Sequence, residues 1–354
     1  MKSFTYTALP ATVVFGSGTV ERIGAEVEAL GCSRAMVLTT PQQEEIAARF
    51  AGLLGKLWTY SFTEAAMHTP VDVTERAVKA ARDSKADCVI AVGGGSSIGL
   101  GKAIALRTGL PQIAVPTTYA GSEATPILGQ TEDGRKTTLR SLQVLPKTIV
   151  YDVDLTLTLP RAMSVTSGMN AIAHAVEALY ARDANPIISS FAEQGMRSLI
   201  SALPKIVRNP QDRKGRSDAL YGAYACGACL GSVGMSVHHK LCHTLGGAFA
   251  LPHAETHTVI LPHAIAYVAP SIPEAIARLS ILLGDADPAN KLFELASNLG
   301  APTSLSAIGM IESRLDEAAG LASDSAYWSP RPVEYAPIRA LLDNAFHGRR
   351  PMPV

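Results

Sequence analysis

The sequence predicts an α/β domain with a Rossmann-like parallel sheet, followed by an all-helical domain. Within residues 1–160, short apolar runs alternate with amphipathic segments, the pattern of parallel strands joined by right-handed helical crossovers. Within residues 161–354, helical periodicity continues without β alternation. A chain of 354 residues is also longer than a single hydrophobic core usually supports, which favours two domains. We place the domain boundary at Thr158-Leu159-Pro160, because a proline commonly ends one unit and opens the next.

The first domain is expected to alternate strands and helices along the chain. The strand candidates are rich in β-branched and aromatic residues and comprise residues 12–15, 35–38, 57–60, 88–92 and 112–115. The helix candidates between them are residues 19–30, 42–55, 71–84 and 98–107. A hairpin near residues 124–140 and a last strand near residues 148–151 would complete this domain.

The second domain is expected to consist of consecutive helices. Thr166 or Ser167 could cap the first of them, since a hydroxyl can accept from the exposed N–H groups of a first turn. The helix candidates are residues 166–182, 186–201, 216–230, 234–247, 273–282, 287–299, 304–318 and 335–345.

A glycine-rich loop follows the strand at 88–92 and leads into a helix. Its residues are Gly93, Gly94, Gly95, Ser96 and Ser97. Glycines let the backbone approach a phosphate, and a helix N-terminus offers unpaired N–H groups at its positive end. Open parallel sheets bind ligands at the carboxyl ends of their strands. An ordinary tight turn is the alternative, but three glycines and two serines in a row favour a dinucleotide site.

Two further segments are candidates for coenzyme contacts. Thr117, Thr118 and Ser122 follow the strand at 112–115, where hydroxyls could bond a phosphate or ribose. Thr39 follows the strand at 35–38, at the place where an acidic residue would pair with the ribose 2′-OH and reject a 2′-phosphate. Because no acid is present there, we expect both NADH and NADPH to be used.

The region from 166 to 257 carries a set of regularly spaced polar residues. Asn170 and His174 are four residues apart, as are His239 and His243, so each pair shares a helical face. His253 follows Gly246-Gly247, which could turn the chain back toward the other imidazoles. A single histidine is usually an ordinary residue. Two such pairs among Ala, Gly and Leu need polar partners, and a cluster supplies them.

These motifs resemble the iron-containing, group III alcohol dehydrogenase superfamily over nearly the whole chain. That family carries Asp-x-x-x-His, then His-x-x-x-His and Pro-His; this chain has Asn170…His174, His239…His243 and Pro252-His253. The Asn for Asp exchange, Gly99 where the superfamily often has Asp, and Pro116-Thr117-Thr118-Tyr119 are similar to its maleylacetate reductase branch.

The resemblance implies a dehydroquinate synthase-like fold and reduction of the conjugated C=C of maleylacetate to 3-oxoadipate by NADH or NADPH, in the degradation of aromatic compounds. It implies that the loop at 93–97 holds the pyrophosphate and that Lys136 lies near the nicotinamide ribose.

The exchange at position 170 changes the expected chemistry. An aspartate with three neutral histidines would hold a divalent Lewis acid, whereas Asn170 offers a weaker, uncharged oxygen. We therefore expect no metal, with histidines stabilising an enolate oxygen by hydrogen bonds. The candidate donors or acids are His243 and His253. His239, His174 and Asn170 would shape the pocket, and Tyr119 and Tyr327 are weaker candidates.

The charge and hydropathy of the chain give no sign of a nucleic-acid or membrane partner. The 31 basic and 31 acidic residues balance, and no Lys/Arg run suggests a nucleic acid. No apolar stretch of about 18 residues indicates a membrane span, and no secretory signal pattern opens the chain, so we expect a cytoplasmic protein. Cys226-Gly-Ala-Cys229 stands alone and is expected to provide buried structural thiols. The expected partners are a small dicarboxylate substrate and a second copy in a homodimer.

Three alternatives remain open from the sequence. A metal-dependent alcohol dehydrogenase could tolerate Asn170, and metal analysis would separate it from a metal-free reductase. A non-catalytic nucleotide-binding protein would show no turnover, although the glycine loop and His243 argue against it. A sugar-phosphate cyclase resembling dehydroquinate synthase would need a phosphate-binding Lys/Arg set near the histidines, and the sequence has none there.

Overall fold

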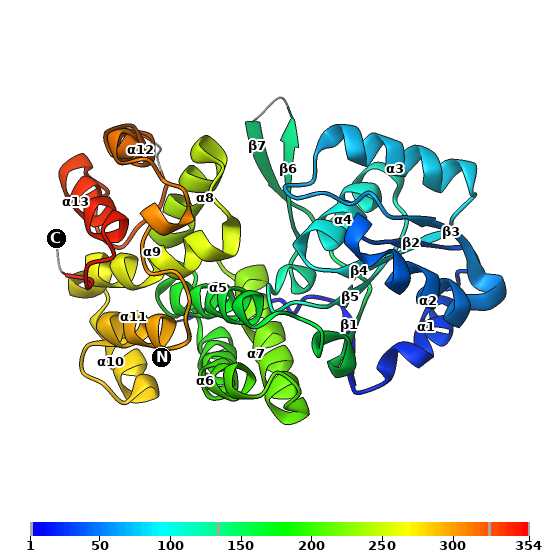
Figure 1. Ribbon diagram of the computed structural model, residues 1–354, viewed down its shortest axis with the longest axis horizontal. Helices are drawn as coiled ribbons and strands as arrows, with labels where there is room; N and C mark the ends of the chain where they lie inside the picture. Colours follow the sequence, from blue (N-terminus) through cyan, green and yellow to red (C-terminus); the bar gives the residue numbers. More distant parts are fainter. Residues whose placement is uncertain (1–2, 133–134, 325–326, 353–354) are drawn as a thin grey trace. The chain divides into compact units, whose positions relative to one another are not determined.

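The computed structural model describes residues 3–132, 135–324 and 327–352 of the chain (Figure 1). The chain separates into two compact units, which we call the sheet unit and the helical unit. The sheet unit comprises Ala8–Leu159 and Gln211–Leu220, and the helical unit comprises Met1–Thr7, Pro160–Pro210 and Tyr221–Val354. One break thus lies at Leu159 and Pro160. The assignment of functional domains to residues 1–160 and 161–354 stays a proposal.

The sheet unit is built on a parallel sheet of six strands, as the alternating pattern predicts. Its spatial order is β1 (Thr12–Gly16), β8 (Thr148–Asp152), β5 (Gln112–Pro116), β4 (Cys88–Gly93), β2 (Ala35–Leu38) and β3 (Trp58–Phe62). The inner strands are buried along their whole length, because helices cover both faces of the sheet. The predicted hairpin is present as β6 (Ile127–Glu132) and β7 (Arg135–Arg140).

The helices of the sheet unit follow from the strand order. From β1 the chain moves through β2 to the edge strand β3, and then returns to β4 and β5. Right-handed crossovers therefore place α1 (Ile23–Ala29) and α2 (Glu44–Leu54) on one face, and α3 (Val71–Asp83) and α4 (Gly95–Thr108) on the other (Figure 1). The core on the first face joins apolar residues of α1 and α2, such as Val27 and Phe50, to Ile90 and Val115 of the sheet.

The helical unit contains most of the predicted helices and one that the sequence did not reveal. Its long helices are α5 (Arg161–Tyr180), α6 (Pro186–Arg208), the larger part of α7 (Arg213–Ser232), α8 (Val237–Phe249), α9 (His253–Val268), α10 (Pro273–Leu283), α11 (Pro288–Asn298), α12 (Leu315–Ser323) and α13 (Tyr335–Phe346). Helix α5 packs against α6 and α9. Helix α9 was missed because nearly all of it is buried, so it shows no amphipathic pattern, and because Pro262 interrupts it.

Three local predictions were wrong. Helix α5 begins at Arg161 after Pro160, so neither Thr166 nor Ser167 caps it; the Ser167 hydroxyl donates to Met163 O within the helix at 2.5 Å. Gly246 and Gly247 lie inside α8, and the chain turns at Ala250, which has a φ of 54°. Residues 304–318 form two short 3₁₀ turns and the start of α12 instead of one helix.

The two cysteines of the Cys-Gly-Ala-Cys motif are buried, as expected. Cys226 and Cys229 are buried free thiols in α7, and burial raises the pKa of Cys229 to about 12. Among the described residues, no individual helix has both the length and the apolar composition of a membrane span, although the sharply bent pair α7 and α8 passes that test jointly.

Candidate active site

The glycine loop joins β4 to α4, as the sequence predicts. Gly93 ends β4 with a φ of 141°, and a Cβ there would lie 2.6 Å from the Ser97 hydroxyl, so a side chain is excluded. A Cβ on Gly95, the first residue of α4, would meet no described atom within 4 Å. The loop therefore closes tightly at Gly93 and leaves open space over the N-terminus of α4.

This loop lies at the point where the chain direction across the sheet reverses. Strands β2 and β4 are neighbours, but the helices that follow them, α2 and α4, cover opposite faces. The carboxyl ends of two such strands leave a crevice, which is where open α/β sheets bind ligands. Thr39 follows β2, and Thr117 donates its N–H to Gly93 O at 3.0 Å. The structure thus brings Thr39, the glycine loop and the Thr117 segment to one edge.

Two buried hydroxyls at this edge lack a partner. The side chains of Thr39 and Ser97 are fully buried, and neither hydroxyl oxygen bonds another described residue. Burying an unbonded hydroxyl is unfavourable unless a ligand or water satisfies it. Together with the open N-terminus of α4, these groups fit the phosphates and ribose hydroxyls of a dinucleotide.

A buried lysine holds the segment after β5, and the sequence analysis missed it. Lys102 of α4 is fully buried, and its Nζ donates to Ser122 O at 2.6 Å, Thr125 O at 2.8 Å, Thr125 Oγ1 at 2.9 Å and Ile127 O at 2.8 Å. Burial lowers the pKa of the Lys102 ammonium to about 7, and the Glu123 charge opposes that shift. Lys102 therefore ties the 117–127 segment to the helix whose N-terminus forms the glycine loop.

The remaining sheet-unit candidates differ in their surroundings. Tyr119 is fully buried, and its hydroxyl accepts from Arg216 Nη1 at 3.1 Å, so it packs inside the unit. Lys136 lies in β7, opposite Thr131, but its side chain is outside the described part of the structure. A Cβ on Gly99 would collide with the Thr69 hydroxyl, which explains why the aspartate common elsewhere in the superfamily does not fit here.

The helical unit brings the predicted histidines into one cluster. Helix α5 supplies Asn170 and His174, α8 supplies His239 and His243, and α9 begins with His253. Asn170 Nδ2 lies 3.4 Å from His174 Nε2, and His174 Nδ1 lies 2.8 Å from His239 Nε2. The ring centroids of His239 and His243 are 6.1 Å apart, and those of His243 and His253 are 6.4 Å apart.

Two further histidines lie in the middle of this cluster. His238 Nε2 and His257 Nδ1 are 2.9 Å apart, and the His257 ring is 4.4 Å from that of His253 and 4.9 Å from that of His239. Both side chains are buried, and burial lowers their pKa values well below the ordinary histidine value. Their signals were present in the sequence, as the pair His238-His239 and as the four-residue spacing from His253.

A buried carboxylate anchors the cluster. Glu177 of α5 is fully buried, and its Oε2 lies 2.6 Å from His239 Nδ1. The main-chain N–H groups of Ser236 and His238 donate to the two carboxylate oxygens at 2.9 and 2.8 Å, and the Tyr180 hydroxyl donates to Oε1 at 3.2 Å. The sequence analysis missed Glu177, because its contact with His239 spans 62 positions of the chain.

Exposure divides the cluster into two groups. Asn170, His174 and His239 are at most 4% exposed. His243 is exposed and His253 is partly exposed. Among the predicted histidines, only these two are open to solvent, and their assignment as donors or acids stays a prediction.

Tyr327 belongs to the same unit as the cluster. Its hydroxyl is buried without a partner among the described residues, and the Lys240 ammonium lies 5.6 Å from its ring centre. Burial raises the pKa of this phenol. Its predicted role in the site stays untested.

The buried imidazoles of the cluster bond one another or Glu177, where a metal site of the resembled superfamily would use them as ligands. Both ring nitrogens of His239 are already engaged, by Glu177 and by His174. His238, His239 and His257 have ring nitrogens within 4.8 Å of one another, but His238 Nε2 and His257 Nδ1 bond each other. With an amide at position 170, the predicted ligand set also contains no anionic oxygen.

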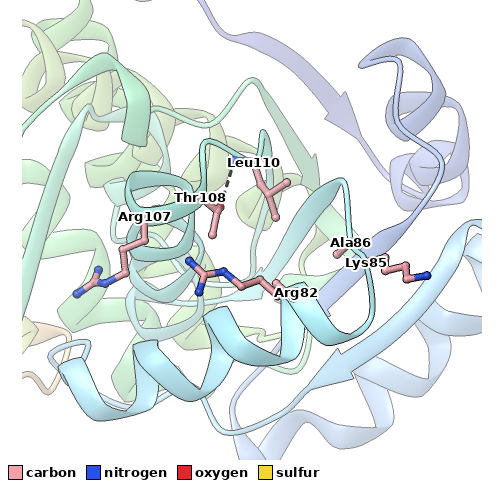
Figure 2. Close-up of a pocket in the computed structure, with 7 residues that line it drawn as sticks. Arg82, Lys85, Ala86, Arg107, Thr108 and Leu110 are labelled. Atoms are coloured by element: carbon pink, nitrogen blue, oxygen red, sulfur yellow. Dashed lines mark hydrogen bonds between the residues drawn. The ribbon is translucent and has the colours of Figure 1, made fainter.

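One described hollow lies in the sheet unit, away from the glycine loop. Figure 2 shows its basic lining, with Arg82, Lys85 and Arg107 around Thr108 and Leu110; its volume is about 420 Å³. These residues lie at or just after the carboxyl ends of α3 and α4, and so at the amino edge of the sheet, opposite the glycine loop. The hollow is therefore separate from the glycine loop.

Comparison with known proteins shows which protein family the chain resembles along its length. Residues 10–153 match the model of the iron-containing alcohol dehydrogenases, and residues 164–346 match the C-terminal model of the Fe-containing alcohol dehydrogenase family. The chain is 57% identical to a maleylacetate reductase of Rhizobium sp. strain MTP-10005, covering 99% of this chain and 100% of the relative. A maleylacetate reductase from Burkholderia cepacia is 51% identical over 99% and 100% of the two chains.

Solved structures agree with this placement. The crystal structure of maleylacetate reductase from Agrobacterium tumefaciens has a TM-score of 0.96 at 56% identity, covering 99% of this chain and 100% of that one. The predicted two-part fold and the expectation of an oxidoreductase are confirmed. The chain belongs to the iron-containing alcohol dehydrogenase family.

Proposed function

We propose that this protein is a maleylacetate reductase that uses NADH or NADPH and works without a metal ion. One observation carries the proposal: the family's metal-ligand cluster is complete except that Asn170 replaces its carboxylate, in a chain 57% identical to a maleylacetate reductase. Histidines without a metal ion can donate hydrogen bonds to an anionic substrate, which suits this cluster to a dicarboxylate better than to a metal-bound alcohol.

The chemistry requires a hydride, a site for developing negative charge and a proton. The nicotinamide delivers hydride to the alkene carbon β to the ketone of maleylacetate. The alkene electrons then form an enolate whose charge lies on the ketone oxygen. Protonation of the α carbon gives 3-oxoadipate, so one substrate, one reduced coenzyme and one proton give one product and one oxidised coenzyme.

The exposed histidines suit the acid and donor roles. His243 and His253 come from different helices, and their rings are nearly parallel, with an interplanar angle of 25°. Preorganised N–H donors stabilise an enolate oxygen without a Lewis acid, and an imidazolium can supply the proton. The buried members, His174, His239 and Asn170, would hold these rings in place.

The coenzyme preference is proposed from the edge of the sheet. Thr39 offers a neutral hydroxyl where an acid would repel a 2′-phosphate. The test follows oxidation of NADH and of NADPH with maleylacetate as substrate. Turnover with both, with kcat/KM values within about a hundredfold or roughly 2.7 kcal/mol, supports the proposal. Absence of turnover with maleylacetate would contradict the proposed reductase activity. Strict use of one coenzyme would contradict the proposal that Thr39 lets the enzyme accept both.

A metal-dependent alcohol dehydrogenase is the second candidate, because His238, His239 and His257 lie close enough to share an ion if their hydrogen bonds rearrange. This function predicts stoichiometric iron or zinc and oxidation of simple alcohols. Metal analysis together with an alcohol screen separates it from the first.

A further inference from the structure

Four buried side chains of the helical unit form a continuous hydrogen-bonded line, Glu177–His239–His174–Asn170. The successive contacts are 2.6 Å from Glu177 Oε2 to His239 Nδ1, 2.8 Å from His239 Nε2 to His174 Nδ1, and 3.4 Å from His174 Nε2 to Asn170 Nδ2. Each residue is at most 4% exposed. A line of this kind in a dry interior must have one consistent direction of donors and acceptors.

The Glu177 end sets that direction. Main-chain N–H groups can only donate, and they bond both carboxylate oxygens, from Ser236 and from His238. Glu177 is therefore an acceptor, and His239 donates to it from Nδ1. His239 Nε2 is then an acceptor for the Nδ1–H of His174. His174 Nε2 is in turn an acceptor, and the Asn170 amide has an N–H to donate.

The two ends are chemically matched. With a carboxylate at 177 and an amide at 170, two neutral imidazoles satisfy the whole line. An aspartate at 170 would make both ends acceptors. Two neutral imidazoles carry only two N–H groups for the three links, so one further cation is needed. A metal ion can supply that charge in a protein with two acidic ends.

We propose that Glu177 and Asn170 are positioning residues that fix the tautomers of His239 and His174 and thereby replace the metal ion. This inference rests on the proposed function only for its catalytic meaning. The ring nitrogens of His239 and His174 are used in these hydrogen bonds, so the two histidines do not act on the substrate. It holds helices α5 and α8 so that the exposed His243, one turn beyond His239, is presented by a rigid support.

The tautomers can be measured directly. ¹⁵N NMR of histidine-labelled, EDTA-treated protein distinguishes protonated from unprotonated ring nitrogens, with His174→Gln and His239→Gln for assignment. In the wild type, both rings should be neutral with the proton on Nδ1. A proton on Nε2 of either ring, with Nδ1 unprotonated, overturns the proposal.

Two variants test the matching of the ends. Asn170→Asp should bind Zn²⁺ at least about tenfold more tightly than the wild type in calorimetric titration. The double variant Asn170→Asp with Glu177→Gln has only one acidic end, so it should bind Zn²⁺ more weakly than Asn170→Asp alone. Equal Zn²⁺ affinity in the folded double variant would contradict the inference.

Control variants separate this effect from simple damage. Tyr180→Phe removes one donor to Glu177 without touching His239, and should leave the histidine spectrum and Zn²⁺ binding unchanged. If the double variant does not fold, the wild-type spectrum and Zn²⁺ binding by Asn170→Asp still decide the proposal. Failure of maleylacetate turnover alongside the predicted tautomers would reject the proposed function alone. Turnover with the opposite tautomers would reject this inference alone.

Discussion

The sheet unit and the helical unit bury charge in opposite ways. In the sheet unit, the Lys102 ammonium donates to three main-chain carbonyl oxygens and a hydroxyl. In the helical unit, the Glu177 carboxylate accepts from two main-chain N–H groups, a phenol and an imidazole. The first arrangement fixes a loop beside the proposed coenzyme site. The second arrangement fixes which ring nitrogens of the histidines donate and which accept. A buried network therefore holds a loop in place in one unit, and in the other it sets the hydrogen bonding of the proposed active-site cluster.

This difference teaches how each unit should respond to mutation. In the sheet unit, removing the cation that holds the loop should weaken coenzyme binding and lower the stability of the protein together. A histidine cluster held by one carboxylate should lose catalysis while coenzyme binding survives. The following predictions test this separation, beginning with the largest effect.

His243→Ala should lower kcat by about 10²- to 10⁴-fold, the usual contribution of a general acid or donor. Its side chain is exposed, so the fold should be unaffected. NADH binding, measured by fluorescence titration, should stay within about twofold of wild type. His347→Ala, at an exposed position on α13's end, is the matched control and should retain activity. Normal kcat in His243→Ala would remove this residue from the mechanism.

Lys102→Met should destabilise the protein by about 3 kcal/mol, because it leaves four buried or partly buried acceptors without their shared donor. It should also weaken NADH binding, since the 117–127 segment loses its tie to α4. Urea unfolding and NADH titration measure the two effects. The exposed Lys85→Met is the control for loss of a lysine charge. Unchanged NADH affinity in a destabilised Lys102→Met would show that the tie is structural only.

Gly95→Val should raise the Kd for NADH by about thirtyfold, or roughly 2 kcal/mol, with little loss of stability. Its Cβ enters space that no described atom fills, which is where the pyrophosphate is proposed to lie. Gly93→Ala is the contrasting variant, because its φ of 141° and the nearby Ser97 hydroxyl should make it destabilising. If Gly95→Val binds NADH normally, the pyrophosphate lies elsewhere.

The smallest effect concerns acid stability. Burial lowers the pKa of His263 to about 4, below its ordinary value of 6.5. The unfolded chain therefore takes up this proton first, and stability is lost as pH falls from about 6.5 to 4. Between pH 7 and 5.5, this residue should account for about 1 kcal/mol. His263→Gln should flatten the pH dependence of urea unfolding by that amount, whereas the exposed His347→Gln should not.

The sequence was informative where a signal is local. The strands, the hairpin and the glycine loop each occupy one continuous segment, so periodicity and turn residues reveal them. The histidine spacings also placed three helix faces correctly in one cluster. Helix α9 escaped because an element buried on every side has no polar face to mark its period.

The contacts that decide the chemistry are long-range and escaped for that reason. In the sequence, Glu177 is an ordinary acidic residue of a helix. Its partner His239 is 62 positions away and reaches it only when α8 packs against α5. Lys102 reads as a solvated lysine of an amphipathic helix until four acceptors from the 122–127 segment surround it. His238 and His257 likewise become partners only through the fold. Burial and partner geometry are properties of the tertiary structure, which spacing alone does not contain.

The central claim is that the amide at Asn170 allows the cluster to work without a metal ion. The most direct measurement is NADH oxidation with maleylacetate by protein dialysed against EDTA, with iron and zinc quantified in the same sample. We expect full turnover with far less than one iron or zinc per chain. Loss of turnover on chelation, with recovery on adding Fe²⁺ or Zn²⁺, would contradict the claim and favour a metal-dependent alcohol dehydrogenase.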